Sequence, residues 1–324
     1  MEKKDLRIVY MGTPDFAVES LKRLVEGGYN VVGVITMPDK PMGRHGSVLQ
    51  PSPVKEYAVS QGLMVLQPEK LKDEAFVEEL RLLHADLQIV VAFRMLPEVV
   101  WNMPRCGTFN LHASLLPQYR GAAPINWAVI NGDNETGITT FFLKHEIDTG
   151  EIIQQVRVPI ADTDNVEIVH DKLMMLGGDL VLETVDAILA GTVKTIPQEE
   201  LIQSESELRP APKIFKDTCH IDWNKSVKEI YDFIRGLSPN PAAWTELCLP
   251  DGNRQVMKIY EAEKVASVHE MKAGEIRTDQ RDYFQIAVKD GFINVLSLQL
   301  AGKKRMGVSD FLRGNRLIAD YKIE

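Results

Sequence analysis

Cysteine and metal-ligand patterns are scarce in this chain. Its 324 residues include three cysteines, Cys106, Cys219 and Cys248, which lie far apart and form no C-x-x-C pair. An odd number of scattered cysteines excludes a disulfide framework and a zinc ribbon. The histidines also lack metal-ligand spacing. We therefore expect reduced, buried thiols and no metal site.

Long apolar runs are missing as well. No stretch reaches the ~18 consecutive apolar residues that span a bilayer. The first residues are mostly charged and lead directly into a short apolar run, without the long apolar core and cleavage site of a signal peptide. These absences predict a cytoplasmic protein with no membrane association.

The two common nucleotide-binding glycine patterns are absent too. A buried strand over residues 6–10 is followed by Gly12, which begins a turn into an amphipathic helix. A dinucleotide fingerprint needs G-x-G-x-x-G at this turn, a P-loop needs G-x-x-x-x-G-K-[ST], and neither motif occurs. The opening is Rossmann-like, but we expect neither NAD nor ATP as a ligand.

The first part of the chain alternates strands and helices. Continuous apolar runs are typical of strands in a parallel sheet, and segments with helical periodicity separate them. The expected strands cover residues 6–10, 30–35, 87–92, 136–143 and 151–158, with helices around 54–61, 73–83 and 165–190. This alternation predicts a doubly wound, mostly parallel α/β domain.

The last part has a different pattern. Residues 192–212 are polar, contain several prolines and have weak periodicity, which is typical of a linker. After an amphipathic helix at 226–237, short alternating segments lie at 255–261, 274–276, 284–288 and 293–300. Short strands at this spacing indicate a small β-barrel. Because 324 residues exceed one ordinary domain, we predict a domain at 1–191, a linker at 192–212 and a barrel domain at 213–324.

The net charge of −9 argues against strong nonspecific binding to nucleic acid. The charge is uneven, however. Residues 207–324 hold 19 Lys and Arg against 17 Asp and Glu, which leaves 18 against 29 for residues 1–206. A local basic surface on the second part is therefore compatible with RNA binding.

The most informative stretch is residues 110–127, which read N-L-H-A-S-L-L-P-Q-Y-R-G-A-A-P-I-N-W. A short β-branched and aromatic run ends with Asn110 and His112, and strand alternation places both on one face. The R-G-A-A-P turn then leads into a helix that holds Trp127. Open α/β sheets bind ligands at the carboxyl ends of their strands. A lone histidine or asparagine is more often structural, so the combination is what indicates a site.

The motif N-x-H-x-S-L-L-P-x-Y-R-G-A-x-P-x-x-W resembles the signature of the folate-dependent formyltransferases. Residues 12–17, G-T-P-D-F-A, and the segment 137–150, which ends in D-T-G, agree with the same family. With the tail included, the resemblance covers nearly the whole chain. It implies a Rossmann-like catalytic domain, an OB-like C-terminal barrel and 10-formyltetrahydrofolate as the formyl donor.

The resemblance also implies roles for individual residues. Asn110, His112 and Asp148 would be catalytic, although Asp148 in an Asp-Thr-Gly sequence is by default a turn former. A larger set would contact the folate, namely Ser114, Leu115, Leu116, Pro117, Phe93 and Leu96. The segment 92–97, A-F-R-M-L-P, lacks the glycine usual in this family and is one residue shorter. This departure changes the loop that carries two of the expected folate contacts.

Two basic groups are candidates for RNA contacts. The loop over residues 37–55 is rich in proline and glycine, which predicts an irregular functional loop, with an ordinary flexible connection as the alternative. By resemblance, its Lys40 and Arg44 approach the acceptor tRNA, although H-G-S at 45–47 replaces lysines common in the family. A second cluster consists of Lys303, Lys304 and Arg305, for which solubilising surface charge is the alternative.

The resemblance predicts an enzyme that moves the formyl group of 10-formyltetrahydrofolate to the α-amino group of initiator methionyl-tRNA in translation initiation. Its partners would be this tRNA and the folate, and no obligate protein partner is indicated. One alternative is a formyl-folate enzyme that acts on a sugar nucleotide or hydrolyses formyl-folate. Another is a folate- or RNA-binding module without catalysis, which the intact set of Asn110, His112 and Asp148 disfavours.

Overall fold

The computed structural model describes residues 2–42, 48–316 and 318–324. The chain divides into two compact units. The first unit contains Met1–Gly121, Thr136–Val158 and His170–Pro210, and the second contains Ala122–Glu135, Pro159–Val169 and Ala211–Glu324. The second unit thus includes two segments from the first half of the chain. The domain boundaries at 191 and 212 stay a prediction.

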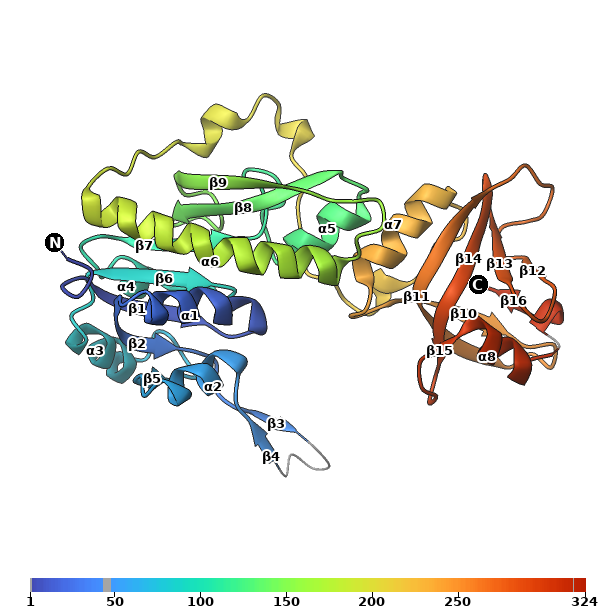
Figure 1. Cartoon of the computed structure of the whole chain (residues 1–324), viewed down its shortest axis with the longest axis horizontal. Helices are drawn as coiled ribbons and strands as arrows, with labels where there is room; N and C mark the ends of the chain where they lie inside the picture. Colours follow the sequence, from blue (N-terminus) through green and yellow to red (C-terminus); the bar gives the residue numbers. More distant parts are fainter. Residues whose placement is uncertain (1, 43–47, 317) are drawn as a thin grey trace. The chain divides into compact units, whose positions relative to one another are not determined.

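The first unit is built on a seven-stranded sheet with the order β5-β2-β1-β6-β7-β8-β9 (Figure 1). Neighbouring strands from β5 to β7 are parallel, whereas β8 is antiparallel to β7. Every residue of β6 is buried, as expected for a sheet covered on both faces. The strands are β1 (Arg7–Gly12), β2 (Asn30–Ile35), β5 (Val65–Leu66), β6 (Leu87–Val91), β7 (Thr108–His112), β8 (Glu135–Phe142) and β9 (Ile152–Pro159).

Helices cover both faces of this sheet. On one face, Val9 and Val90 belong to the same buried cluster as Leu80 of α3. On the other face, Gly177 of α6 approaches β7 so closely that an added Cβ would lie 2.7 Å from Leu111. The helices of this unit are α1 (Val18–Glu26), α2 (Pro53–Ser60), α3 (Glu74–Leu82), α4 (Glu98–Trp101) and most of α6 (Val166–Ala190), with a 3-10 turn η1 (Asp15–Ala17) before α1, whereas α5 (Pro124–Ile130) belongs to the second unit. The predicted doubly wound α/β fold is confirmed.

The loop expected over residues 37–55 is partly regular. β3 (Lys40–Met42) and β4 (Val48–Gln50) form an antiparallel pair, with Lys40 opposite Gln50 and Pro41 opposite Leu49. A two-stranded ribbon tolerates proline because each of its strands has a free edge. The prediction of an entirely irregular loop was therefore wrong for these residues. Residues 43–47, with Arg44, lie outside the described part of the chain.

The second unit contains an antiparallel sheet with the order β12-β13-β14-β11-β10-β16, and β15 pairs with β14. A Cβ on Gly274, next to β12, would lie 2.6 Å from the carbonyl oxygen of Ile323 in β16, so the two edge strands approach each other. This nearly closed barrel confirms the predicted C-terminal fold. Its strands are β10 (Ala243–Cys248), β11 (Arg254–Ala266), β12 (Ile276–Thr278), β13 (Phe284–Val288), β14 (Gly291–Leu300), β15 (Met306–Gly307) and β16 (Lys322–Ile323).

Two further helices, α7 (Val227–Leu237) and α8 (Val308–Gly314), pack against this barrel. Ser226 caps α7 in a capping box with Glu229, which satisfies the main-chain N–H groups of these two residues. The apolar side of α7, with Ile230 and Ile234, belongs to the barrel core. None of the described helices, the 25-residue α6 included, is both long and apolar enough to cross a membrane.

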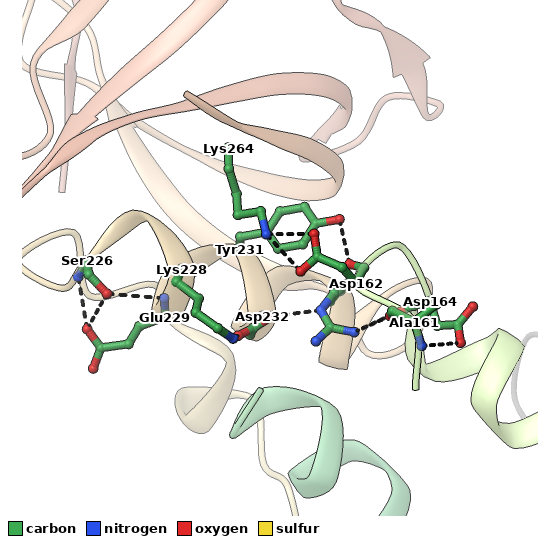
Figure 2. A network of polar contacts seen from close by, with 10 residues as sticks. Ala161, Asp162, Asp164, Ser226, Lys228, Glu229, Tyr231, Asp232 and Lys264 are labelled. Atoms are coloured by element: carbon green, nitrogen blue, oxygen red, sulfur yellow. Dashed lines mark hydrogen bonds and ion pairs between the residues drawn. The ribbon is translucent and has the colours of Figure 1, made fainter. Parts of the chain in front are cut away.

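A polar network in the second unit joins residues 161–164 to α7 and β11 (Figure 2). Arg235 Nε donates to Asp232 Oδ1 over 2.7 Å, and their side chains are only 7% and 3% exposed. The same guanidinium donates to the carbonyl oxygen of Asp164 over 2.8 Å. Lys264 pairs with Asp162 over 2.7 Å, but there the carboxylate is 61% exposed. Among the described residues, the network therefore contains one ion pair with both side chains buried, Arg235–Asp232, and two pairs with an exposed side chain, Lys264–Asp162 and Lys228–Asp232.

This difference predicts unequal losses of stability. Arg235→Ala is expected to lower the free energy of unfolding by about 3 kcal/mol, because Lys228 is then the one ion-pair partner of the buried Asp232 among the described residues. Lys264→Ala, the matched control, removes an exposed pair and should cost less than about 1 kcal/mol. Urea unfolding of both variants measures the two values. Equal losses would contradict the larger contribution expected of the buried pair.

Candidate active site

The strand β7 lies between β6 and β8, and its carboxyl end is at the same edge as the carboxyl end of the parallel β6. Leu111 faces α6, so alternation directs Asn110 and His112 to the opposite face of the sheet. In the register, Asn110 is opposite Phe141 of β8, and His112 is opposite Thr139. The two predicted polar groups therefore share one face at a carboxyl edge, as the sequence predicted.

Both ring nitrogens of His112 have a defined neighbour. Nε2 lies 2.9 Å from the carbonyl oxygen of Tyr119 and must donate to it, because a carbonyl only accepts. Nδ1 lies 3.9 Å from Asp148 Oδ2, which is an electrostatic contact and longer than a hydrogen bond. The imidazole is 6% exposed. It is thus held with Nδ1 on the side where Asp148 lies.

Asp148 has a fixed carboxylate and an unusual backbone conformation. Its Oδ2 accepts a hydrogen bond of 3.0 Å from the main-chain N–H of Gly121. Its backbone has φ of 55°, in the left-handed region that aspartate tolerates better than most residues. The alternative of a simple turn former predicts that its carboxylate bonds to the residues just after it. Instead the carboxylate reaches toward His112 and Gly121, far away in sequence.

Asn110 contributes an unsatisfied acceptor. Its Oδ1 is buried, and no donor among the described residues reaches it. Buried side-chain oxygens in native proteins are normally paired with a protein group, a water molecule or a ligand. This atom therefore marks a place where a donor from outside the chain fits.

The segment that follows β7 is fixed to β8 and β9. Thr139 Oγ1 donates to the carbonyl oxygen of Ser114 over 2.7 Å, and the N–H of Leu116 donates to the same hydroxyl over 3.2 Å. Gln155 Nε2 donates to the carbonyl oxygen of Leu116 over 2.8 Å. The main chain at 114–116 is therefore a rigid wall beside the site.

The six expected folate contacts occupy different surroundings. Ser114 is fully buried and its hydroxyl donates to the carbonyl oxygen of Gln118, while Leu116 packs with Phe141 and Ile152. Pro117 is buried, and Leu115 is half-buried. Phe93 and Leu96 pack against the separate core cluster of β6 and α3, with Phe93 half-buried. Among these six, Leu115 and Phe93 keep the most accessible side chains.

The expected RNA contacts fall in both units. Lys40 is exposed in β3, and Arg44 is outside the described residues. Lys303 and Lys304 are exposed, with no acidic partner in the part of the chain that the structure describes. Arg305 differs, because its guanidinium donates to Glu261 over 2.5 Å and stacks over Tyr260 with 4.5 Å to the ring centroid. It is therefore less available to a phosphate than the two lysines.

The sequence interpretation missed two residues at this site. Arg120 and Gln198 bond to each other, and Gln198 also bonds to the main chain of Asp148 and Gly150. Arg120 lies inside the quoted motif, but nothing in its spacing identifies its partner. Gln198 lies in a polar stretch without periodicity, where no local pattern predicts burial.

The described residues contain no group of three or more His, Cys, Asp or Glu that could hold a metal ion. All three cysteines are free. Cys219 is buried, and its burial raises the pKa of the thiol, whereas Cys106 and Cys248 are half-buried. The expectation that all three thiols are buried therefore holds fully for Cys219 alone.

Two family models match this chain. The model described as "Formyl transferase" matches residues 6–185, and the one described as "Formyl transferase, C-terminal domain" matches residues 213–316. Together they cover the chain except residues 1–5, 186–212 and 317–324.

Full-length relatives agree with these models. The methionyl-tRNA formyltransferase of Phocaeicola vulgatus is 86% identical over 324 residues, and that of Parabacteroides distasonis is 74% identical over 323, each covering 100% of both chains. A solved sugar 3N-formyl transferase, WlaRD, crystallised in the presence of dTDP and 5-N-formyl-THF, has a TM-score of 0.62 at 18% identity, over 92% of this chain and 99% of that one. That likeness shows the fold alone. The chain therefore belongs to the formyl transferase family and, within it, to the methionyl-tRNA formyltransferases.

Proposed function

We propose that this protein transfers the formyl group of 10-formyltetrahydrofolate to the α-amino group of initiator methionyl-tRNA, in the cytoplasm, as a step of translation initiation. The observation that carries the proposal is the arrangement of Asn110, His112 and Asp148 at the carboxyl edge of β7. Two side chains that can donate hydrogen bonds, next to a carboxylate that can accept a proton, provide the groups needed when an amine attacks a formyl carbon. Relatives of 86% and 74% identity over the full length carry the methionyl-tRNA name, which supports this acceptor over a sugar nucleotide.

The reaction forms a bond between the amine nitrogen and the formyl carbon, and the carbonyl oxygen becomes negative. We assign stabilisation of this oxygen to the Asn110 amide and to His112, which donates from Nδ1 when that nitrogen also carries a proton, because Nε2 already donates to Tyr119. One well-placed donor of this kind contributes about 3 kcal/mol in the transition state. The unpartnered Oδ1 of Asn110 suits an N–H group of the incoming amine.

A proton must also move. An α-amino group has a pKa of about 8, so a useful fraction is neutral and can attack without a covalent enzyme intermediate. Asp148 takes the proton from the attacking nitrogen, directly or through a water, and returns it to the folate nitrogen as the bond between that nitrogen and the formyl carbon breaks. The carboxylate ends as it began, and the products are formyl-methionyl-tRNA and tetrahydrofolate.

The folate binds, in this proposal, along the wall formed by residues 114–117. Leu115 and Phe93 supply apolar contact, because their side chains are half-buried and ligand pockets are mostly apolar. The remaining expected contacts are buried: Ser114, Leu116 and Pro117 belong to the wall itself, whereas Leu96 packs in the separate core cluster of β6 and α3.

The molecule that receives the formyl group distinguishes the proposed function from its alternatives. The protein is incubated with formyl-folate and, in separate reactions, with charged initiator tRNA, with an amino-sugar nucleotide or with buffer alone. The proposal expects formylation of the tRNA-bound methionine. Formylation of the sugar would establish the alternative transferase, and release of formate in buffer would establish a hydrolase.

The proposed tRNA contacts are Lys40, Arg44, Lys303, Lys304 and Arg305. Replacing Lys303 and Lys304 with Ala is expected to weaken tRNA binding and to reduce the slope of log affinity against log salt by about two units, roughly one per lost phosphate contact. Turnover at saturating tRNA should stay nearly unchanged. Binding titrations at several salt concentrations measure the slope.

A double variant with the same change in net charge serves as the control. Lys225 and Lys272 are also exposed lysines of the second unit. Replacing both with Ala should leave the slope unchanged if the contact at 303–304 is local. Equal slopes for the two double variants would leave Lys303 and Lys304 as ordinary surface charges.

A further inference from the structure

One polar side chain of the segment between the two matched ranges is completely buried. Gln198 opens the 3-10 turn η3 (Gln198–Leu201) and is 0% exposed, although Glu199 and Glu200 beside it are exposed. Burial of an amide is unfavourable unless its hydrogen bonds are satisfied. Gln198 therefore needs specific hydrogen-bond partners inside the protein.

The amide of Gln198 uses its full hydrogen-bonding capacity. Nε2 donates to the carbonyl oxygens of Asp148 and Gly150, both over 2.8 Å. Oε1 accepts from Arg120 Nε over 3.0 Å and from Arg120 Nη2 over 2.7 Å. The orientation of the amide follows from chemistry, because carbonyl oxygens only accept and a guanidinium only donates.

The segment around Gln198 is itself anchored. Ile196 exchanges two hydrogen bonds with Ile152, the first residue of β9, both over 2.9 Å. Gln198 therefore approaches the loop between β8 and β9 from a fixed position. On the other side, its partner Arg120 lies between Tyr119, which accepts from His112, and Gly121, which donates to Asp148.

These contacts converge on a strained residue. Asp148 has φ of 55°, a conformation that costs a non-glycine residue free energy and persists where its surroundings impose it. Residues 144–147 before it are exposed, and one of them, His145, contacts Trp101 and Glu98 of α4. The two donors from Gln198 hold the main chain directly at Asp148 and at Gly150.

We propose that Gln198 is a positioning residue, which holds the carboxylate of Asp148 at its working distance from His112. The inference rests on the proposed function, in which Asp148 carries the proton between the amine and the folate nitrogen. Gln198 touches neither substrate in this account. It acts through the loop main chain, and Arg120 fixes the amide in the orientation that presents both N–H groups to that loop.

Two substitutions separate the two sides of the amide. Gln198→Met keeps the length of the side chain and removes all four hydrogen bonds. Gln198→Glu keeps an acceptor for Arg120 but loses both donors to the loop. Because a misplacement of about 1 Å can cost 100-fold in rate, we expect both variants to lower kcat by about 10- to 100-fold with KM for both substrates within about twofold.

A double-mutant cycle tests whether the effect passes through Asp148. In the Asp148→Asn background, Gln198→Met should change kcat by less than about twofold, because the group that it positions is already inactive. A merely structural role predicts the same fold-loss in both backgrounds. Equal losses, or a Gln198→Glu variant with normal kcat, would overturn the inference.

Gln88→Met is the control for loss of a buried glutamine. Gln88 of β6 accepts from Thr108 through Oε1 over 3.1 Å, and its buried Nε2 has no partner among the described residues. The substitution removes one hydrogen bond rather than four, so it should lower Tm less than Gln198→Met and keep kcat within about twofold; equal kcat losses in both would also overturn the inference. The wild-type protein shows which of the two proposals has failed. If it does not transfer the formyl group to methionyl-tRNA, the proposed function is refuted. If it does and the Gln198→Met variant has the same kcat, only the positioning role is refuted.

Discussion

Replacement of Asn110 or His112 with Ala, or of Asp148 with Asn, is expected to lower kcat by about 100-fold or more while substrate binding changes little. Asn110 and His112 share one face of β7, and His112 lies with Nδ1 3.9 Å from the Asp148 carboxylate. Each substitution removes a group that stabilises the charge developing in the transition state or that carries the proton being transferred. Such a group affects kcat more than the affinity for the ground state.

Steady-state kinetics with formyl-folate and charged tRNA measure these losses. His170 offers a matched control, because it pairs with Asp171 over 3.0 Å and packs edge-on against Phe16. His170→Ala removes an imidazole with a carboxylate neighbour at a place unrelated to the proposed chemistry, and kcat should stay within about twofold. Near-normal turnover in all three active-site variants would refute the assignment of Asn110, His112 and Asp148.

Gly150→Ala is expected to lower kcat by about 100-fold and the free energy of unfolding by about 3 kcal/mol. A Cβ at Gly150 would lie 1.6 Å from the carbonyl oxygen of Phe142 and 3.1 Å from the Phe141 ring. A Cβ has no rotamer that avoids the clash, so the loop main chain must move. Asp148, two residues earlier, then moves with it.

Gly191→Ala is the control for this substitution. Gly191 has φ of 65°, and an added Cβ would meet nothing within 4 Å. Alanine in the left-handed region costs about 1–2 kcal/mol, and Gly191 lies outside the site, so kcat should be unchanged. Thermal unfolding and turnover of both variants test the difference. A fully active Gly150→Ala variant would show that the loop does not depend on this close approach.

The central strand of the site was predictable because its signals are local. An apolar run ending in Asn110 and His112 gives a strand, alternation gives the shared face, and the Pro-containing turn gives the start of α5. The same holds for α7, where Ser226 and Glu229 form the capping box at the predicted start of the helix. In these cases the periodicity of the chain determines which side chains are buried.

Other features were not predictable, because they depend on partners distant in sequence. The partner of Gln198 is Asp148, 50 residues earlier, and the stretch around it has no period that indicates burial. Arg305 was assigned to RNA by its charge, yet Glu261 of β11 is its nearest acidic partner. Charge and composition identify such groups, but only the folded chain determines what they meet.

The segments that make up the second unit were also difficult to predict from the sequence. The helix that holds Trp127 was expected within the first domain, but Trp127 Nε1 donates to the carbonyl oxygen of Pro212 over 2.8 Å. Asn126 Nδ2 donates to the carbonyl oxygen of Gly236 in α7, where an added Cβ would lie 2.6 Å from Ile130. An apolar helix face predicts that a partner exists but does not identify it, so the sequence does not indicate that the helix at 124–130 packs with α7.

The most direct test of the account is a single-turnover reaction of the wild-type protein with formyl-labelled folate and charged initiator tRNA. The loss of label from the folate and its appearance on the methionine α-amino group are followed by rapid quenching. We predict equal rates and equal amounts for the two, with slow loss of label when tRNA is omitted. Loss of label as formate at the same rate with and without tRNA would contradict the transfer mechanism.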